Sequence, residues 1–121
     1  MPVILVVVDD PAARDPVVET LKRLFPWARV MAVCVETALP LAVSEGATVV
    51  VAGLSAAERL CREGGPPAAP VVALTREMRP DTLLRAEALG IAGALRAPPD
   101  AKQLATVLGP LVGAPPPQDH R

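Results

Sequence analysis

Two adjacent carboxylates, Asp9 and Asp10, directly follow the apolar run Val3–Val8. Clustered carboxylate oxygens are the ligands that a hard divalent cation such as Mg²⁺ prefers. The same residues also suit a helix start, because Asp10 can accept a hydrogen bond from a first-turn N–H and Pro11 fits the first turn. A carboxylate at Asp9 is stabilised by the dipole of such a helix without any metal. We therefore interpret the pair first as helix-capping residues, with metal binding as the alternative.

A second position that could carry chemistry holds a glycine. The stretch TVVVAGLSAAE, residues 48–58, begins as a short apolar run that is typical of a strand buried on both faces of a parallel sheet. In open α/β sheets, ligands and reactive groups lie beyond the carboxyl ends of such strands. Gly53 stands at this end and has no side chain. We predict that a reactive group is missing there.

Other metal-binding and nucleophilic residue types have no useful spacing. Cys34 and Cys61 lie far apart, and the single histidine is His120. Neither a zinc motif nor a Cys–His nucleophile is therefore predicted, and we expect no metal or cofactor. Both cysteines are predicted to be small core residues in a reducing cytoplasm.

The composition predicts a cytoplasmic protein with one folded domain. The chain has 121 residues, 51% of them hydrophobic, and a formal net charge of −1. This length suffices for one domain with a sizeable core. The longest apolar run, Val3–Val8, is far shorter than the roughly 18 residues that a membrane span needs, and no secretory signal is recognisable. The net charge is close to zero, so the chain lacks the excess of basic residues that is typical of nucleic-acid-binding domains. We expect neither a membrane nor a nucleic acid as partner.

Apolar runs alternate with helix-period segments along the chain. The predicted strands are Val3–Val8, Arg29–Val35, Thr48–Ala52, Val71–Leu74 and Ile91–Leu95. The predicted helices are Pro11–Leu24, Glu36–Ser44, Ser55–Arg62, Pro80–Leu89 and Asp100–Leu111. Pro16 and Pro40 fall inside two of these helices, so an irregular start or a kink is expected there. Gly90 marks a helix end, and Asp100 marks a helix start.

This alternation predicts an α/β fold with right-handed crossovers and three layers, α/β/α, of the flavodoxin-like type. We expect a five-stranded parallel sheet of order 2-1-3-4-5 in residues 1–112, followed by a disordered proline-rich tail in residues 113–121. In this order the first and third strands end at one crevice, beside Asp9, Asp10 and Gly53. The residues expected to be buried in the central strands are Val6, Val7, Val50, Val51, Val72 and Leu74.

Two segments resemble the response-regulator receiver (CheY-like) family: VILVVVDDPAARDPVVETL, residues 3–21, and PVVALTREMRPDTLLRAEALGIAGALRAPPDAKQLATVL, residues 70–108. In the second segment, Thr75, Gly90 and Pro98 fall where the family pattern has a strand-ending threonine, a helix-ending glycine and a proline after the last strand. The resemblance extends over about residues 2–112. It implies the fold described above and a cis peptide bond before Pro98.

The resemblance also implies where a phosphorylation site would lie. Receivers accept a phosphoryl group on an aspartate at the end of the third strand, and only a carboxylate can form that acyl phosphate. This aspartate maps to Gly53, or to Ala52 if the register shifts by one. The acidic pair that binds Mg²⁺ maps to Val8 and Asp9, or to Asp9 and Asp10. The degenerate site positions are thus Asp9, Asp10, Gly53, Thr75, Ala97 and Pro98.

The family's lysine maps to Ala97, and its aromatic switch residue maps to Ala94. Arg96 is a poor substitute for that lysine, because neighbouring strand residues point to opposite faces. The resemblance further implies that partners or a second copy bind the face made by the fourth helix, fifth strand and fifth helix. The residues expected on this face are Leu83, Glu87, Ala94, Arg96, Gln103 and Val107; the alternative is an ordinary solvated surface.

We therefore interpret the chain as a pseudo-receiver: a non-enzymatic signalling module that is not phosphorylated by the aspartyl route and that binds a signalling protein or forms a homodimer. One alternative is a small-ligand or metal-binding flavodoxin-like module built on Asp9, Asp10, Thr75 and Arg96. Another is an enzyme of a different flavodoxin-like family, for which no glycine-rich phosphate loop or other motif is present.

Overall fold

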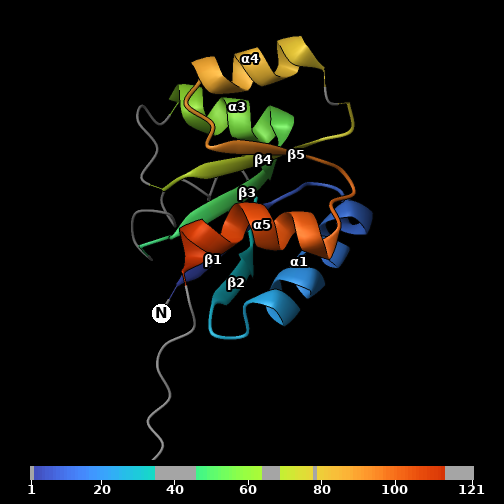
Figure 1. Ribbon diagram of the computed structural model, residues 1–121, viewed down its shortest axis with the longest axis vertical. Helices are drawn as coiled ribbons and strands as arrows, with labels where there is room; N and C mark the ends of the chain where they lie inside the picture. The colour runs from blue at the N-terminus through green and yellow to red at the C-terminus, as the bar shows by residue number, and fades with distance from the viewer. Residues whose placement is uncertain (1, 35–45, 64–68, 78, 114–121) are drawn as a thin grey trace, which may run out of the picture.

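Five parallel strands and the helices around them form three layers in the computed structural model, which describes residues 2–34, 46–63, 69–77 and 79–113 (Figure 1). In chain order the elements are β1 (Val3–Val7), α1 (Pro11–Leu24), β2 (Arg29–Ala32), β3 (Val49–Gly53), α3 (Leu54–Glu63), β4 (Val71–Thr75), α4 (Pro80–Ala88), β5 (Gly93–Arg96) and α5 (Ala101–Val112). The strand order is β2-β1-β3-β4-β5, and every neighbouring pair is parallel. The predicted fold class and strand order are confirmed. The predicted helix Glu36–Ser44 and the tail beyond residue 113 lie outside the described residues.

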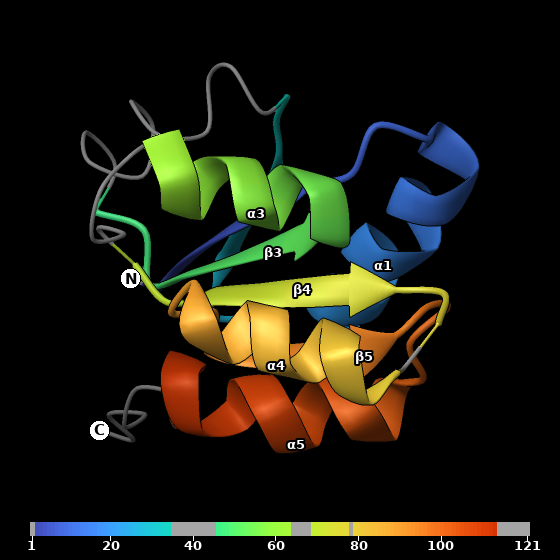
Figure 2. The ribbon, with the colours of Figure 1, turned by 90° about the horizontal axis from the view of Figure 1, so that it is seen from above.

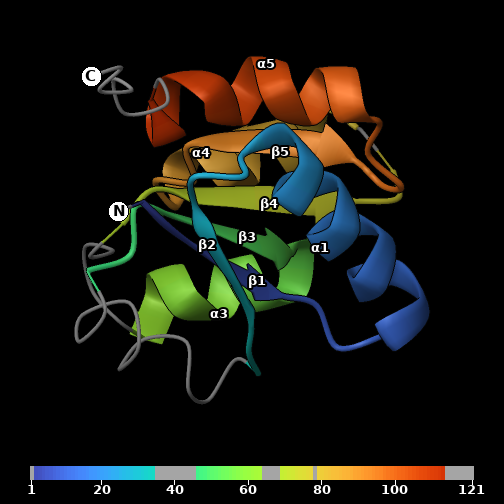
Figure 3. The same ribbon diagram turned by 90° about the horizontal axis from the view of Figure 1, so that it is seen from below.

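Helices cover both faces of the sheet: α1 and α5 lie on one face, and α3 and α4 lie on the other (Figures 2 and 3). Successive side chains of a strand point to opposite faces of the sheet, so alternate strand residues pack into two separate cores. In β1, for example, Ile4 and Val6 pack with α1 and α5, whereas Leu5 packs with α3 and α4. The strand residues predicted to be central are all buried, namely Val6, Val7, Val50, Val51, Val72 and Leu74.

Local signals set several helix ends as predicted. The carboxylate of Asp100 accepts a hydrogen bond from the Gln103 N–H at 2.6 Å and caps α5. After α4, Gly90 adopts a φ of +80°, which glycine tolerates without a Cβ clash. Pro16 lies inside α1, which nevertheless runs as one helix from Pro11 to Leu24.

The predicted start of the fifth strand was wrong by two residues. The Ile91 N–H donates to the Ala86 carbonyl at 2.9 Å, and the Gly90 N–H donates to Glu87 at 3.0 Å. These bonds form the Schellman arrangement that closes α4. Because Ile91 is part of this helix end, β5 begins only at Gly93.

The prediction that both cysteines belong to the core was wrong for Cys34, which is exposed just beyond the edge strand β2. Cys61 in α3 is half-buried, and burial raises the pKa of its thiol. A thiol with a raised pKa stays protonated and is a poor nucleophile. In the described part of the chain, no helix is long and apolar enough to cross a membrane.

Candidate functional site

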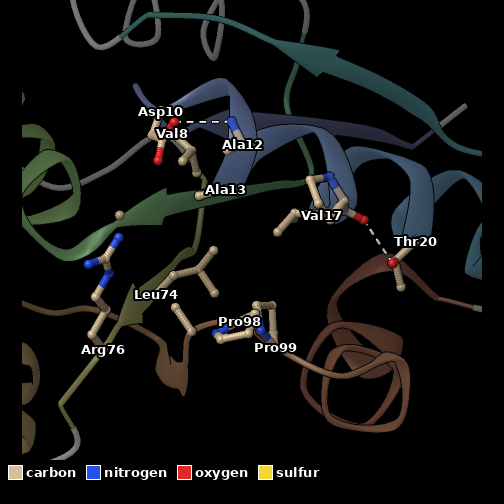
Figure 4. A pocket seen from close by; sticks show the side chains of 13 residues that line it. Val8, Asp10, Ala12, Ala13, Val17, Thr20, Leu74, Arg76, Pro98 and Pro99 are labelled. Atoms are coloured by element: carbon tan, nitrogen blue, oxygen red, sulfur yellow. Dashed lines mark hydrogen bonds between the residues drawn. The ribbon is translucent and has the colours of Figure 1, made fainter.

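The carboxyl ends of β1, β3, β4 and β5 meet beside the first half of α1, and a cavity of about 570 Å³ opens there (Figure 4). Two connections that follow strands, residues 8–10 and 97–99, contribute to its wall. This is the crevice that the strand order predicted, since parallel strands end at a common edge.

The connection after β1 holds two carboxylates that lie in different surroundings. The Asp10 Oδ1 accepts a hydrogen bond from the Ala12 N–H at 3.0 Å, so Asp10 is the N-cap of α1, as the capping interpretation predicted. Asp10 and Val8 both line the cavity. Asp9 is exposed and lies outside the lining. The structure therefore does not bring two neighbouring acids into the cavity together.

Gly53 is the last residue of β3 and borders the cavity directly. A Cβ atom built at Gly53 would meet no other atom within 4 Å. Ala52 is instead fully buried inside the sheet, between Val7 and Ala73. Of the two positions that the sequence left open, Gly53 is the one at the cavity, and its backbone offers no nucleophile.

Thr75 and Arg76 at the end of β4 have different roles. The Thr75 hydroxyl donates to the Glu77 carbonyl at 3.1 Å and accepts from the Glu77 N–H at 3.3 Å, so it is engaged in its own turn, outside the cavity lining. Arg76 is exposed and lines the cavity. Its guanidinium has no hydrogen-bond or ion-pair partner among the described residues.

The connection after β5 forms the wall opposite α1. The peptide bond between Ala97 and Pro98 is cis, as the resemblance implied. The Ala97 N–H donates to the Thr75 carbonyl at 2.7 Å, which fixes this connection to the end of β4. Ala97, Pro98 and Pro99 all line the cavity and bring no charge to it.

Among the described residues, the lining of the cavity is therefore mostly apolar, with Arg76 as its one cation. Its charged lining residues are Asp10, which is engaged in capping, and Arg76. Within the described ranges, no group of three or more His, Cys, Asp or Glu residues could hold a metal ion. Of the alternative ligand set Asp9, Asp10, Thr75 and Arg96, only Asp10 reaches the cavity.

Two features of this cavity were not anticipated from the sequence. One is Arg76, because the sequence offered a basic residue only in the alternative ligand set, and that residue, Arg96, lies exposed at the end of β5. The other is the wall formed by α1, where Ala12, Pro16 and Thr20 recur every four residues. That spacing is the signal in the sequence that marks this wall.

The predicted partner-binding face combines exposed and half-buried side chains. Leu83 on α4 is 45% exposed, as expected for that position, and Glu87, Arg96 and Gln103 are exposed. Ala94 and Val107 are half-buried on opposite sides of β5, and Val107 packs over Gly93. The sequence missed Leu84, which is 67% exposed and is the more accessible leucine of α4.

No family model matches the chain, and no curated protein matches it. Solved structures do. The signal receiver domain of a DNA-binding response regulator from Colwellia psychrerythraea has a TM-score of 0.76 and 24% identity, covering 93% of this chain and 98% of that one. Chemotaxis protein CheY4 from Vibrio cholerae has a TM-score of 0.73 and 21% identity, covering 89% and 96%.

A response regulator receiver protein from Pseudoalteromonas atlantica has a TM-score of 0.72 and 16% identity, covering 92% of this chain and 97% of that one. At these identities the likeness establishes the fold, which is that of response-regulator receiver domains.

Proposed function

We propose that this chain is a pseudo-receiver, a signalling module with the receiver fold that takes no phosphoryl group on an aspartate. The observation that carries the proposal is Gly53 at the end of β3, facing open space inside the cavity. An acyl phosphate requires a carboxylate at the reacting position. The backbone of Gly53 cannot supply one.

Two further losses at the same edge support the proposal. Ala97 stands immediately before the cis Pro98, where the receiver pattern has a lysine to pair with the phosphoryl group. The acidic pair that would help to hold Mg²⁺ maps to Val8 and Asp9 or to Asp9 and Asp10, and in both registers Asp9 lies outside the cavity lining. Without the nucleophile, the counter-charge and the metal ligand, in-line phosphoryl transfer has no stabilised transition state.

The test is incubation of the chain with acetyl phosphate and Mg²⁺, followed by intact-mass measurement, with a phosphorylatable receiver domain as positive control. We expect no mass increase of one phosphoryl group. Phosphorylation that survives acid belongs to a serine or threonine and agrees with the proposal. An adduct that hydroxylamine removes is an acyl phosphate and would refute it.

We also propose that signalling occurs by contact with a protein partner or a second copy, through the face formed by α4, β5 and α5. Leu83 and Leu84 give α4 exposed apolar area, and Arg96 is exposed at the end of β5, the strand that α4 contacts. Apolar residues with an adjacent arginine are typical of an interface core. Such a role needs no catalysis. Cys34 and Cys61 form no disulfide, which is compatible with a cytoplasmic location.

A Leu83→Glu, Arg96→Glu double variant tests this face. The matched control is Lys22→Glu, which places a glutamate at an exposed position of α1. Circular dichroism should show that both variants are folded. Light scattering and pull-down should then show loss of self-association or of a captured partner only in the double variant. If association persists in the double variant, the interface lies elsewhere.

A further inference from the structure

We infer that the cavity at the carboxyl edge of the sheet binds an elongated apolar molecule that carries one carboxylate. Its hydrocarbon part would lie along α1, and its carboxylate would pair with Arg76.

The size and lining of the cavity carry the first step. Its volume of about 570 Å³ falls within the roughly 300–1,000 Å³ that small-molecule pockets occupy. Its walls are mostly apolar and come from Val8, Val17, Leu74 and the two prolines Pro98 and Pro99. An inorganic phosphate would leave these apolar walls in contact with water. A hydrocarbon would bury them.

The shape of the cavity favours a chain-like ligand. Ala12, Pro16 and Thr20 lie on successive turns of α1, and the eight steps from Ala12 to Thr20 rise by about 12 Å. An extended chain covers about 3.5 Å for every three bonds, so this length matches a straight chain of about ten atoms. In Figure 4, Arg76 and Thr20 lie at opposite ends of the cavity.

The polar groups decide the sign of the ligand's charge. At one end, the Thr20 hydroxyl is already engaged, because it donates to the Pro16 carbonyl at 2.8 Å. The Asp10 carboxylate is engaged in capping α1. Arg76 has no partner in the described part of the chain, and a guanidinium pairs with a carboxylate through two parallel hydrogen bonds. Asp10 keeps its negative charge while it caps α1, and Arg76 is thus the one described lining residue that can pair with an anion.

Calorimetric titration of the whole chain with hexanoate, octanoate and decanoate tests the hydrocarbon part. Each methylene buried should lower the Kd about fourfold, so decanoate should bind roughly two-hundredfold more tightly than hexanoate. Decanol should bind about tenfold more weakly than decanoate, because it cannot form the charged pair with Arg76. Inorganic phosphate should not compete with decanoate.

Two pairs of variants locate the site. Arg76→Gln should remove the preference for decanoate over decanol, whereas Arg79→Gln, in the same connection but outside the lining, should keep it. Ala13→Leu should narrow the cavity and weaken decanoate binding at least tenfold. Ala88→Leu adds the same side chain to an exposed position of α4 and should leave binding unchanged.

The inference is overturned if decanoate does not bind at millimolar concentration, if affinity does not rise with chain length, or if Arg76→Gln and Arg79→Gln bind alike. Ligand binding and acyl-phosphate formation are measured separately. A chain that binds decanoate and also forms an acyl phosphate would refute the proposed function and leave the ligand site standing.

Discussion

Residues 49–52 of β3 are at most 4% exposed, whereas Gly53, one residue further along the same strand, borders a cavity where a side chain would meet no atom within 4 Å. The interior of the sheet is closely packed on both faces. The carboxyl edge lies outside this packing. Because the interior provides the stability, chemistry at the edge can be absent while the fold persists.

The largest expected effect comes from placing a carboxylate in each region of β3. Val51 and Gly53 lie on the same face of the strand, since they are two residues apart. Val51→Asp buries a charge without a partner and should cost more than about 4 kcal/mol, enough to unfold the chain. Gly53→Asp places the carboxylate in open space and should leave a cooperative thermal transition.

Far-ultraviolet circular dichroism shows whether each variant is folded, and urea titration measures its free energy of unfolding. If Val51→Asp folds as well as Gly53→Asp, the interior is not the source of stability and the contrast between the two regions fails.

Removing apolar volume should give the next largest effect. Leu104 in α5 is fully buried in the core beneath α1 and α5, so Leu104→Ala should destabilise the fold by about 2–5 kcal/mol. Leu84→Ala removes the same atoms from an exposed site and should change stability by less than about 0.5 kcal/mol. The urea midpoints of the two variants, at unchanged m-value, compare their stabilities. Equal losses of stability would contradict the assignment of Leu104 to the core.

A smaller effect separates the two interpretations of Asp10. Asp10→Ala removes the cap of α1 and should cost about 1 kcal/mol. Asp10→Ser keeps a capping oxygen but loses the carboxylate, so it should retain most of the stability. Thermal melts of both variants decide between the roles: equal losses for Ser and Ala would mean that the charge, rather than the cap, matters.

The smallest expected effect is that of Mg²⁺. A ligand stabilises the folded state only to the extent that its concentration exceeds its Kd. Since the described residues contain no cluster of three acidic, His or Cys ligands, 10 mM Mg²⁺ should shift the melting temperature by less than about 1 °C beyond matched ionic strength. A rise of several degrees that Asp10→Ser abolishes would place a cation site at this edge after all.

The sequence predicted the sheet order, the buried valines and the caps at Asp10 and Asp100, because these depend on local periodicity and on single side chains. It did not predict the cavity. Residues such as Ala13, Leu74 and Pro99 come from separate elements, and nothing in their spacing marks a common wall. Nor did it identify Arg76, because along a strand end one residue decides which side chain faces the crevice.

The direct junction between β3 and α3 has a consequence for motion. β3 ends at Gly53 and α3 begins at Leu54, so no residue between them is free to change its backbone torsions. Hinges usually lie in loops or at element ends. A change in the direction of α3 relative to β3 would therefore have to occur at Gly53 and Leu54 alone. The connections 8–10 and 97–100 lead into α1 and α5, and both border the cavity. A molecule bound in the cavity would therefore touch the segments that join these two helices to the sheet, but not a loop between β3 and α3.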